Sequence, residues 1–512
     1  MKTMTKRVFA ITGALALGLT ALKAQTDSAL LDALVKKGVL TEKEADDIRA
    51  NEAKDYATTP AAKLGISNSV TKLTLYGDVR YRYEYADEKA QSTTNNPSAG
   101  TTNAAGNNIV ERSRYRLRVG VDFNFTDNFT AGFELETGTA NDSANQTFGS
   151  AYEKAAINVG LAYLQWKPVD WLTLTGGKQR NPLYTTDLVW DPDINPEGAS
   201  EVMTWTFPLG GEAAPVGDPK EVGSLSTGSS SDESLTIGLT ALQGIYAENS
   251  GFNSPHVAGQ NNQNVWQFVE QVPVQFNFDK STFVKIVPGF DTYTSGGNNG
   301  PGNGPTPEAG GGTQAFMADN AADDLAIITA PGEFDWKAFN QPFKFYWDFA
   351  ANLNGKARVQ DVYLVVTPGL TPNAATFHTQ NQNRDLADNI AWLAGLQVGQ
   401  NKKKGDWSIK ADYRVVGLGS VDPNLNDSDW ADSFLNQQGV KVQSTYNFTD
   451  FLTGTITVYD TWDYKSNLFS GQNTSQLQVG NPTNVSGTTA GLIGLAAASQ
   501  VQRVDVDLQW KF

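Results

Sequence analysis

Arginines occur at alternate positions in two segments near the start of the chain, and another lies close to its end. They are Arg80, Arg82, Arg112, Arg114, Arg116, Arg118 and Arg503. A guanidinium group keeps its positive charge at any physiological pH, and alternate residues of a β-strand point to the same face. The spacing therefore predicts a surface of fixed positive charge, which attracts anions and orients dipoles but does not by itself make or break bonds.

A proline-rich segment, residues 181–198, supplies charges of the opposite sign. Its acids are Asp187, Asp191, Asp193 and Glu197. If this segment folds toward the arginines, the two sets of charges produce an electric field across the space between them. Two alternatives stay open. The acids of the segment lie in solvent, or the arginines are neutralised by acids on the strands, namely Asp78, Glu84, Asp122, Glu134 and Glu136.

Other kinds of chemistry have little support in the sequence. The chain has no cysteine, and its two histidines, His256 and His378, fall in predicted loops without ligand spacing. We therefore expect no metal site, no cofactor and no serine-hydrolase arrangement, and hence no enzyme. Residues 422–429 contain Asp and Asn side chains that suit calcium. Because Asp and Asn are also common turn residues, an acidic surface loop is the favoured interpretation.

The elements that position the arginines are predicted strands. In residues 73–85 apolar and aromatic side chains alternate with charged ones, and residues 110–125 and 501–512 repeat the pattern. Each such strand has one apolar and one charged face. In a soluble sandwich the apolar face would form the core, but the strand lengths suit a tilted membrane strand. Aromatic residues also gather at strand ends, as they do at membrane interfaces: Tyr83, Tyr85, Trp166, Trp171, Trp205, Phe207, Trp462, Tyr464, Trp510 and Phe512.

The connections between the predicted strands alternate in length. Short turns follow the even-numbered strands and long polar loops follow the odd-numbered ones, as in bacterial outer-membrane barrels; residues 208–233 are an exception. We predict an all-β fold, a transmembrane antiparallel β-barrel of about 16 strands with a short N-terminal α-helical hairpin. Closure places the first, second and last strands side by side, so that the arginines form one wall of the lumen. The strands are expected at 73–85, 110–125, 129–137, 155–166, 171–180, 199–207, 234–246, 264–278, 282–293, 341–352, 357–367, 389–400, 406–416, 438–448, 451–464 and 501–512.

The first 24 residues predict a signal peptide. A positively charged start is followed by an apolar run, Val8–Leu22, and by Ala24 before the expected cleavage site. The alternative is a membrane anchor, for which the run is short. We expect three parts: residues 1–24 as the signal peptide, residues 25–69 as a periplasmic helical hairpin and linker, and residues 70–512 as the transmembrane barrel.

The expected helical hairpin has two recognisable parts. Ser28–Lys37 carries apolar residues at helical spacing, and Thr41 with Glu44 has the pattern of a capping box at the start of a second helix. A pair of this size is too small to fold alone. It is either an oligomerisation or docking element in the periplasm or an extension that rests against the base of the barrel.

Several stretches resemble known outer-membrane proteins. The end of the chain resembles their membrane-insertion signal. Residues 171–184 (WLTLTGGKQRNPLY), 191–198 and 38–44 resemble the putative porin family of Gram-negative bacteria. The resemblance implies a diffusion channel in the outer membrane, often a homotrimer, inserted by the outer-membrane insertion machinery and surrounded by outer-membrane lipid. The residues of the insertion signal are Val504, Val506, Leu508, Trp510 and Phe512.

The function predicted from the sequence is that of an outer-membrane porin, which allows passive diffusion of small hydrophilic solutes and ions. The alternatives are a substrate-selective channel that prefers anions because of its arginines, a barrel enzyme, and a soluble secreted adhesin. The formal net charge of −16 repels nucleic acid, so we expect no nucleic-acid partner.

Overall fold

The structure is a computed structural model, and its described residues belong to two compact units. The smaller unit comprises Met1–Leu75, Val121–Gly132 and Leu164–Pro168, and the larger one comprises Tyr76–Gly120, Phe133–Tyr163 and Val169–Phe512. No described helix is long and apolar enough to cross a membrane. The structure describes residues 34–48, 69–90, 107–138, 140, 142–209, 233–247, 265–294, 325–355, 388–433, 435–465 and 498–512.

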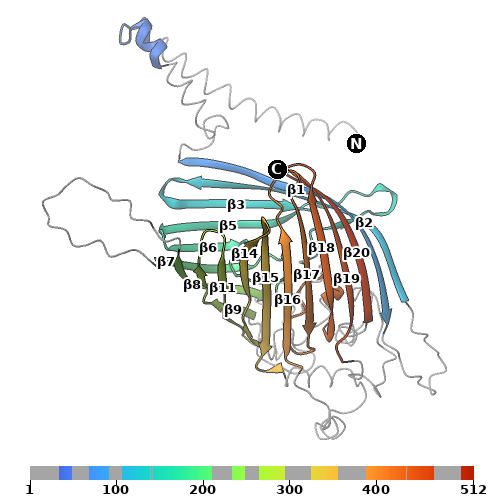
Figure 1. Ribbon diagram of the computed structural model, residues 1–512. Helices are drawn as coiled ribbons and strands as arrows, with labels where there is room; N and C mark the ends of the chain where they lie inside the picture. The colour runs from blue at the N-terminus through green and yellow to red at the C-terminus, as the bar shows by residue number, and fades with distance from the viewer. Residues whose placement is uncertain are drawn as a thin grey trace, which may run out of the picture. The chain divides into compact units, whose positions relative to one another are not determined.

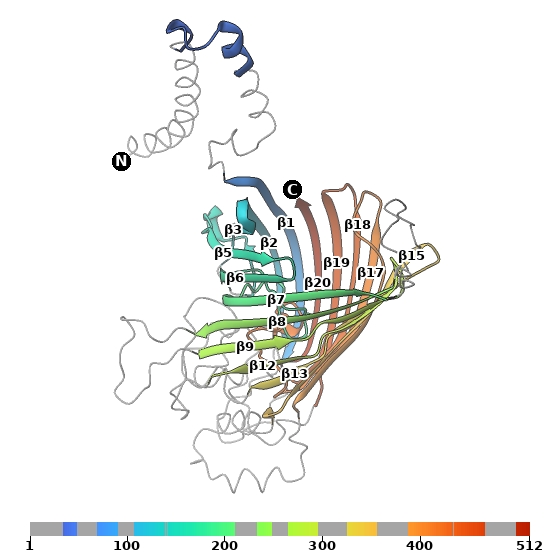
Figure 2. The same ribbon diagram turned by 90° about the vertical axis from the view of Figure 1, so that its left-hand side faces the viewer.

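The strands form one antiparallel sheet that closes on itself. Figure 1 shows β15 to β20 side by side, and Figure 2 shows the sheet continuing through β7, β8 and β9. The strands are β1 (Val70–Ala90), β2 (Asn107–Phe125), β3 (Phe129–Glu136), β4 (Gln146–Thr147), β5 (Asn158–Val169), β6 (Leu172–Lys178), β7 (Glu197–Pro208), β8 (Ser234–Ala247), β9 (Val265–Gln271), β10 (Val274–Asn277), β11 (Phe283–Ile286), β12 (Gly289–Tyr293), β13 (Ala326–Thr329), β14 (Gly332–Ala338), β15 (Gln341–Asn352), β16 (Ile390–Gly399), β17 (Trp407–Val416), β18 (Gln437–Asn447), β19 (Leu452–Asp463) and β20 (Ala498–Lys511).

Three strands of the barrel are each interrupted by a proline. Pro273 separates β9 from β10, Pro288 separates β11 from β12, and Pro331 separates β13 from β14. Proline has no N–H to donate, so the ladder breaks there. The proline carbonyls still accept hydrogen bonds from the neighbouring strands, at 2.7 Å from Gly238 and 2.9 Å from Val272 for the first two. When each interrupted strand counts once and the two-residue β4 is left out, the ring has sixteen strands, and the predicted fold class is confirmed.

One strand of the ring was not predicted from the sequence. The ring includes β13 and β14, which the sequence did not predict because Pro331 and Gly332 interrupt their pattern. The strand predicted at 357–367 lies outside the described residues, and β15 pairs directly with β16 along Phe343–Ala351. The predicted alternation of short turns and long loops holds around this ring, with the connection between β7 and β8 as the exception.

The outer face of the barrel is apolar and its inner face is polar. Val79, Tyr81 and Tyr83 of β1 are exposed, whereas Asp78 and Arg82, which alternate with them, are buried. Aromatic side chains pack against one another at the end with the short turns. Ring centroids are 5.5 Å apart for Trp171 and Trp205, 5.4 Å for Trp336 and Phe343, and 4.9 Å for Trp510 and Phe512. Such a belt marks the level of a membrane interface.

The smaller unit contains the described part of the N-terminal segment, with helical residues at 34–36 and 42–48. The predicted capping box is present. The backbone N–H of Thr41 donates to Glu44 Oε2 at 2.9 Å, and the N–H of Glu44 donates to Thr41 Oγ1 at 3.3 Å. The bond from the Thr41 backbone lowers the pKa of the Glu44 carboxyl. The boundary predicted at residue 69 remains a prediction.

Short 3₁₀ segments complete the described elements: η1 (Thr126–Asn128), η2 (Ser150–Tyr152) and η4 (Ala431–Ser433).

Candidate functional site

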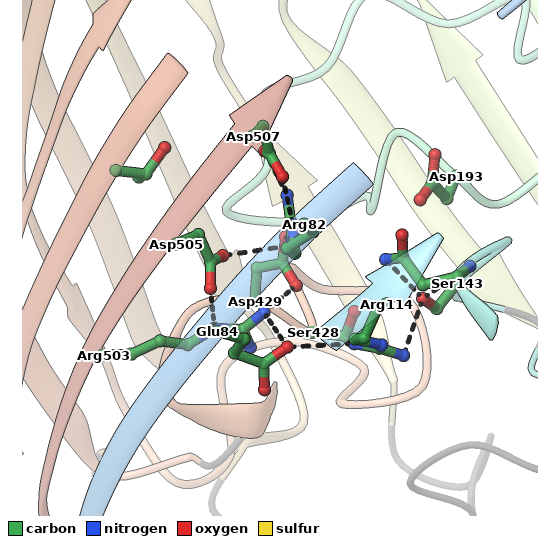
Figure 3. Close-up of polar contacts among 12 residues, drawn as sticks. Arg82, Glu84, Arg114, Ser143, Asp193, Ser428, Asp429, Arg503, Asp505 and Asp507 are labelled. Carbon is green, nitrogen blue, oxygen red and sulfur yellow. Dashed lines mark hydrogen bonds and ion pairs between the residues drawn. The ribbon is translucent and has the colours of Figure 1, made fainter. Parts of the chain in front are cut away.

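The arginines predicted from the alternation lie on the inner face of β1, β2 and β20, and we call them the arginine wall. Arg82 is 4% exposed. Its guanidinium binds both oxygens of Asp507, at 2.8 and 2.9 Å, and contacts Asp505 at 3.0 Å (Figure 3). Asp507 lies directly opposite Arg82 because β1 and β20 pair in that register. Barrel closure therefore creates this contact between residues 425 positions apart.

Glu84 forms ion pairs with three arginines of the arginine wall. It contacts Arg112 at 2.6 Å, Arg114 at 3.2 Å and Arg503 at 3.3 Å. Glu84 is 1% exposed. A carboxylate buried at this depth is stable only with such partners.

Asp78 has the same role for the next two arginines of β2. Its two oxygens contact Arg116 at 2.9 Å and Arg118 at 2.7 Å. Arg80 instead donates to the amide oxygen of Asn145 at 2.7 Å. The proposal that acids on the strands neutralise the arginines is thus confirmed for Asp78 and Glu84.

Two long connections lie inside the barrel against its wall, and we call them L3 (residues 179–196) and L7 (residues 417–436). Leu188 of L3 and Trp430 of L7 are each 1% exposed. They share one apolar cluster with inward-facing wall residues such as Tyr346 and Leu393. Burying these large apolar side chains inside the barrel is more favourable than leaving them exposed to water. L3 and L7 therefore occupy part of the lumen.

L3 and L7 are joined by backbone hydrogen bonds. The N–H of Asp191 donates to the carbonyl of Leu425 at 2.5 Å, and the N–H of Asp427 donates to the carbonyl of Asp187 at 3.1 Å. The Asp191 carboxylate accepts from both the backbone and the hydroxyl of Ser428, at 3.0 and 2.9 Å. The two loops consequently behave as one insert.

Acids on both loops reach the arginine wall. Asp193 of L3 lies 3.3 Å from Arg116 and 3.4 Å from Arg118. Asp429 of L7 lies 2.7 Å from Arg82 and 2.6 Å from Arg503. Arg503 and Arg82 outweigh the effect of burial and hold the pKa of Asp429 well below its usual range. The insert is therefore bound to this wall through charge.

Two further cations, one on β17 and one on β18, also bind the insert. Arg414 is 1% exposed and contacts Asp412 at 3.0 Å, Asp187 of L3 at 3.2 Å and Asp427 of L7 at 3.4 Å. Lys441 contacts Asp187 at 2.6 Å and Asp427 at 3.1 Å. Burial opposes the ionisation of Asp187, but Arg414 and Lys441 hold its pKa well below the usual range.

Asp191 forms no ion pair with a cation among the described residues, unlike Asp187, Asp193, Asp427 and Asp429. Burial and the negative charges of Asp427 and Asp193 raise its pKa to about 9, although the backbone hydrogen bonds that it accepts from Ser428 and Asp193 act in the opposite direction. At neutral pH this carboxyl therefore keeps its proton where the two loops meet.

Among known families, residues 65–295 match the model of the putative porin family. Over these residues the chain is similar to that family. The closed barrel with its apolar outer face is the arrangement of a β-barrel that spans an outer membrane.

Several solved porins are similar to this chain. OmpF of Salmonella typhi, in complex with daunomycin, is 11% identical with a TM-score of 0.40, over 87% of this chain and 99% of that chain. The outer membrane channel DcaP of Acinetobacter baumannii is 11% identical with a TM-score of 0.34, over 87% and 99%. A triple mutant of the Rhodopseudomonas blastica porin is 8% identical with a TM-score of 0.35, over 86% and 100%. No curated protein matches the sequence.

The predicted field between loop acids and arginines exists only in part. Asp193 faces the arginine wall, but Asp187 faces Arg414 and Lys441, and Asp191 contacts L7. The placement of Glu197 was wrong. It begins β7 on the same face as the exposed Trp205, and it pairs with Lys178 with 59% of its side chain exposed.

Sequence reasoning missed Arg414, Lys441 and the inward fold of L7. The alternation that revealed the arginine wall could have found the two cations, because Asp412 and Arg414 share one face of β17. L7 also carries a signal of its own. A solvated acidic loop has no need for large apolar residues, yet this one has Leu418, Val421, Leu425, Trp430 and Leu435.

The residues of the predicted insertion signal lie on the outer face of β20. Leu508, Trp510 and Phe512 are exposed there. Phe512 also closes the ring, since its N–H and carbonyl exchange hydrogen bonds with Gly77 at 3.1 and 3.2 Å.

Proposed function

We propose that this protein allows passive diffusion of small hydrophilic solutes and ions through its lumen. The observation that carries the proposal is a closed sixteen-strand ring with an apolar outside and a charged inside, in a chain that is similar to the putative porin family. Conductance of the purified protein in a planar bilayer tests it. We expect steps of constant size with a linear current–voltage relation. A protein that inserts as a folded barrel but passes no current would contradict the proposal.

We further propose that the L3–L7 insert and the arginine wall form the constriction. The support is that Asp193 and Asp429 bring the insert into contact with Arg116, Arg118 and Arg82. Every arginine of the wall except Arg80 forms an ion pair within the part of the chain that the structure describes. Because the charges compensate one another, we expect weak ion selectivity instead of the strong anion preference that uncompensated arginines would give.

Neutralising part of the arginine wall should change this selectivity. In Arg114→Gln/Arg116→Gln/Arg118→Gln the carboxylates of Asp78 and Glu84 lose cationic partners and add negative charge to the lumen. We expect reversal potentials in a KCl gradient to show a permeability ratio of K⁺ to Cl⁻ several-fold above that of the native protein. The exposed lysines of Lys36→Gln/Lys37→Gln/Lys43→Gln provide a control with the same loss of charge. An unchanged ratio in the arginine variant would remove these residues from the pore.

The proton on Asp191 should make the insert sensitive to pH. An ordinary Asp in an unfolded chain ionises near pH 4, whereas Asp191 does so at about 9. The folded insert therefore holds a proton that free chain would release, and its stability falls as the pH rises between these values. We expect larger current fluctuations at pH 8.5 than at pH 5.5, and no such difference in Asp191→Asn. Equal pH dependence in both proteins would refute this role.

The processing and assembly of the protein are further proposals. We propose cleavage after Ala24, insertion by the outer-membrane machinery with Phe512 as part of its signal, and assembly as a homotrimer. They rest on the sequence pattern and the family resemblance.

Deletion of Phe512 should greatly reduce the amount of heat-modifiable barrel in the membrane fraction, since it also removes the hydrogen bonds to Gly77. N-terminal sequencing and chemical cross-linking test the other two proposals, and an undiminished yield of the truncated barrel would count against the signal.

A further inference from the structure

The turn between β16 and β17 concentrates lysines at the end of the barrel that has the short turns. Lys402, Lys403 and Lys404 follow one another there, and all are exposed. We call these three residues the lysine patch. Each of the other described short turns has at most one lysine.

The acids near the lysine patch accept hydrogen bonds from backbone N–H groups. The Asp406 carboxylate accepts from the N–H groups of Lys402 and Lys403, both at 3.0 Å, and Asp450 accepts from the N–H of Lys404 at 2.6 Å. The ammonium groups of the patch form no ion pair within the described ranges. Three lysines against two aspartates leave the patch positive, and the bonded acids hold the turn in a fixed shape.

Exposed aromatic side chains lie directly beside the lysine patch. Trp407 is 41% exposed, and it lies opposite Tyr446 in the pairing of β17 with β18. Phe448 stands 5.3 Å from Tyr446, and Phe451 follows in the same turn as Asp450. Aromatic rings of this kind sit at the headgroup level of a bilayer. The lysines, which lie just beyond them, are thus at the depth of the lipid phosphates.

We propose that the lysine patch binds the headgroups of anionic phospholipids in the periplasmic leaflet of the outer membrane. Short turns face the periplasm in bacterial barrels. Lysines near a membrane surface bind anionic lipid through charge, while their methylene chains lie along the apolar layer. The ligand is a phosphodiester headgroup with a net negative charge, held by its acyl chains against the outer face of β17 and β18.

Native mass spectrometry of the full chain in detergent tests this binding, with equal amounts of phosphatidylglycerol and phosphatidylcholine added. We expect the native protein to retain phosphatidylglycerol preferentially, and Lys402→Gln/Lys403→Gln/Lys404→Gln to retain it about tenfold less. Lys402→Arg/Lys403→Arg/Lys404→Arg should keep the preference. The control Lys36→Gln/Lys37→Gln/Lys43→Gln loses as many exposed positive charges elsewhere and should also keep it.

The proposal is overturned if the glutamine variant retains phosphatidylglycerol as the native protein does, or if the control loses it equally. A second measurement does not depend on the folding of any variant. Raising the salt concentration should release phosphatidylglycerol from the native protein, because exposed charges are screened. Retention that does not respond to salt would also overturn the proposal.

Discussion

Removing L7 should raise the single-channel conductance of the protein by at least about twofold, because the lumen would lose one of the two loops that occupy it. The fold permits the deletion. Val416, the last residue of β17, pairs directly with Gln437, the first residue of β18, so a short Gly–Ser turn can join the two strands in place of residues 418–435. The shortened chain keeps every strand of the ring.

The expected increase has two sources. The volume of L7 itself becomes available to water, and L3 loses the backbone bonds that tie Asp191 to Leu425 and Asp187 to Asp427. Asp193 keeps its contacts with Arg116 and Arg118, so L3 stays attached to the arginine wall. We therefore expect a larger conductance with more frequent fluctuations, not a fully open barrel.

Two controls separate this effect from general damage. The deletion variant must still migrate as a heat-modifiable barrel, which shows that the ring has closed. Lys178→Gln/Glu197→Gln removes a charge pair whose glutamate points away from the lumen, and it should leave conductance unchanged. A folded deletion variant with native conductance would show that the narrowest part of the pore lies elsewhere.

The parts of the site that the sequence predicts are those fixed by local geometry. Alternation places Arg80 and Arg82 on one face of β1, and the same two-residue period places Arg114, Arg116 and Arg118 on one face of β2. The parity of the turns then brings β1 beside β20, and Arg503 joins the wall. Apart from the closure of the barrel, none of these steps depends on a contact between residues far apart in the sequence.

The parts that the sequence does not predict depend on how loops pack. Arg414 and Asp187 are 227 positions apart, and Lys441 and Asp187 are 254 positions apart. No periodicity links such residues, because a loop can lie in solvent or in the lumen with the same sequence spacing. The choice depends on burial of residues such as Leu188 and Trp430. The continuity of the strand around Pro331 could not be predicted for the same reason. The strand continues there because the Pro331 carbonyl accepts a hydrogen bond from the N–H of Val287, which is distant in the sequence.

Replacing Arg414 by methionine should lower the free energy of unfolding of the barrel by about 3–5 kcal/mol, the usual cost of removing one partner from a buried ion pair. Asp187, Asp412 and Asp427 all contact this guanidinium, and each would then lack one cationic partner. Lys441 can serve only Asp187 and Asp427 from its position on β18. Urea unfolding in lipid vesicles, followed by tryptophan fluorescence, measures the change.

Lys410 provides the matched control on the same strand. It lies four residues from Arg414 and faces the ring of Tyr346 at 4.8 Å, and its charge acts on Asp187 only from a distance, without an ion pair among the described residues. Lys410→Met should therefore cost much less than Arg414→Met. The double variant Arg414→Met/Asp187→Asn removes a cation together with one of its acids, so its loss should be smaller than that of Arg414→Met alone. If Arg414→Met proves no worse than Lys410→Met, the charges do not hold the insert, and apolar packing around Leu188 and Trp430 must do so by itself.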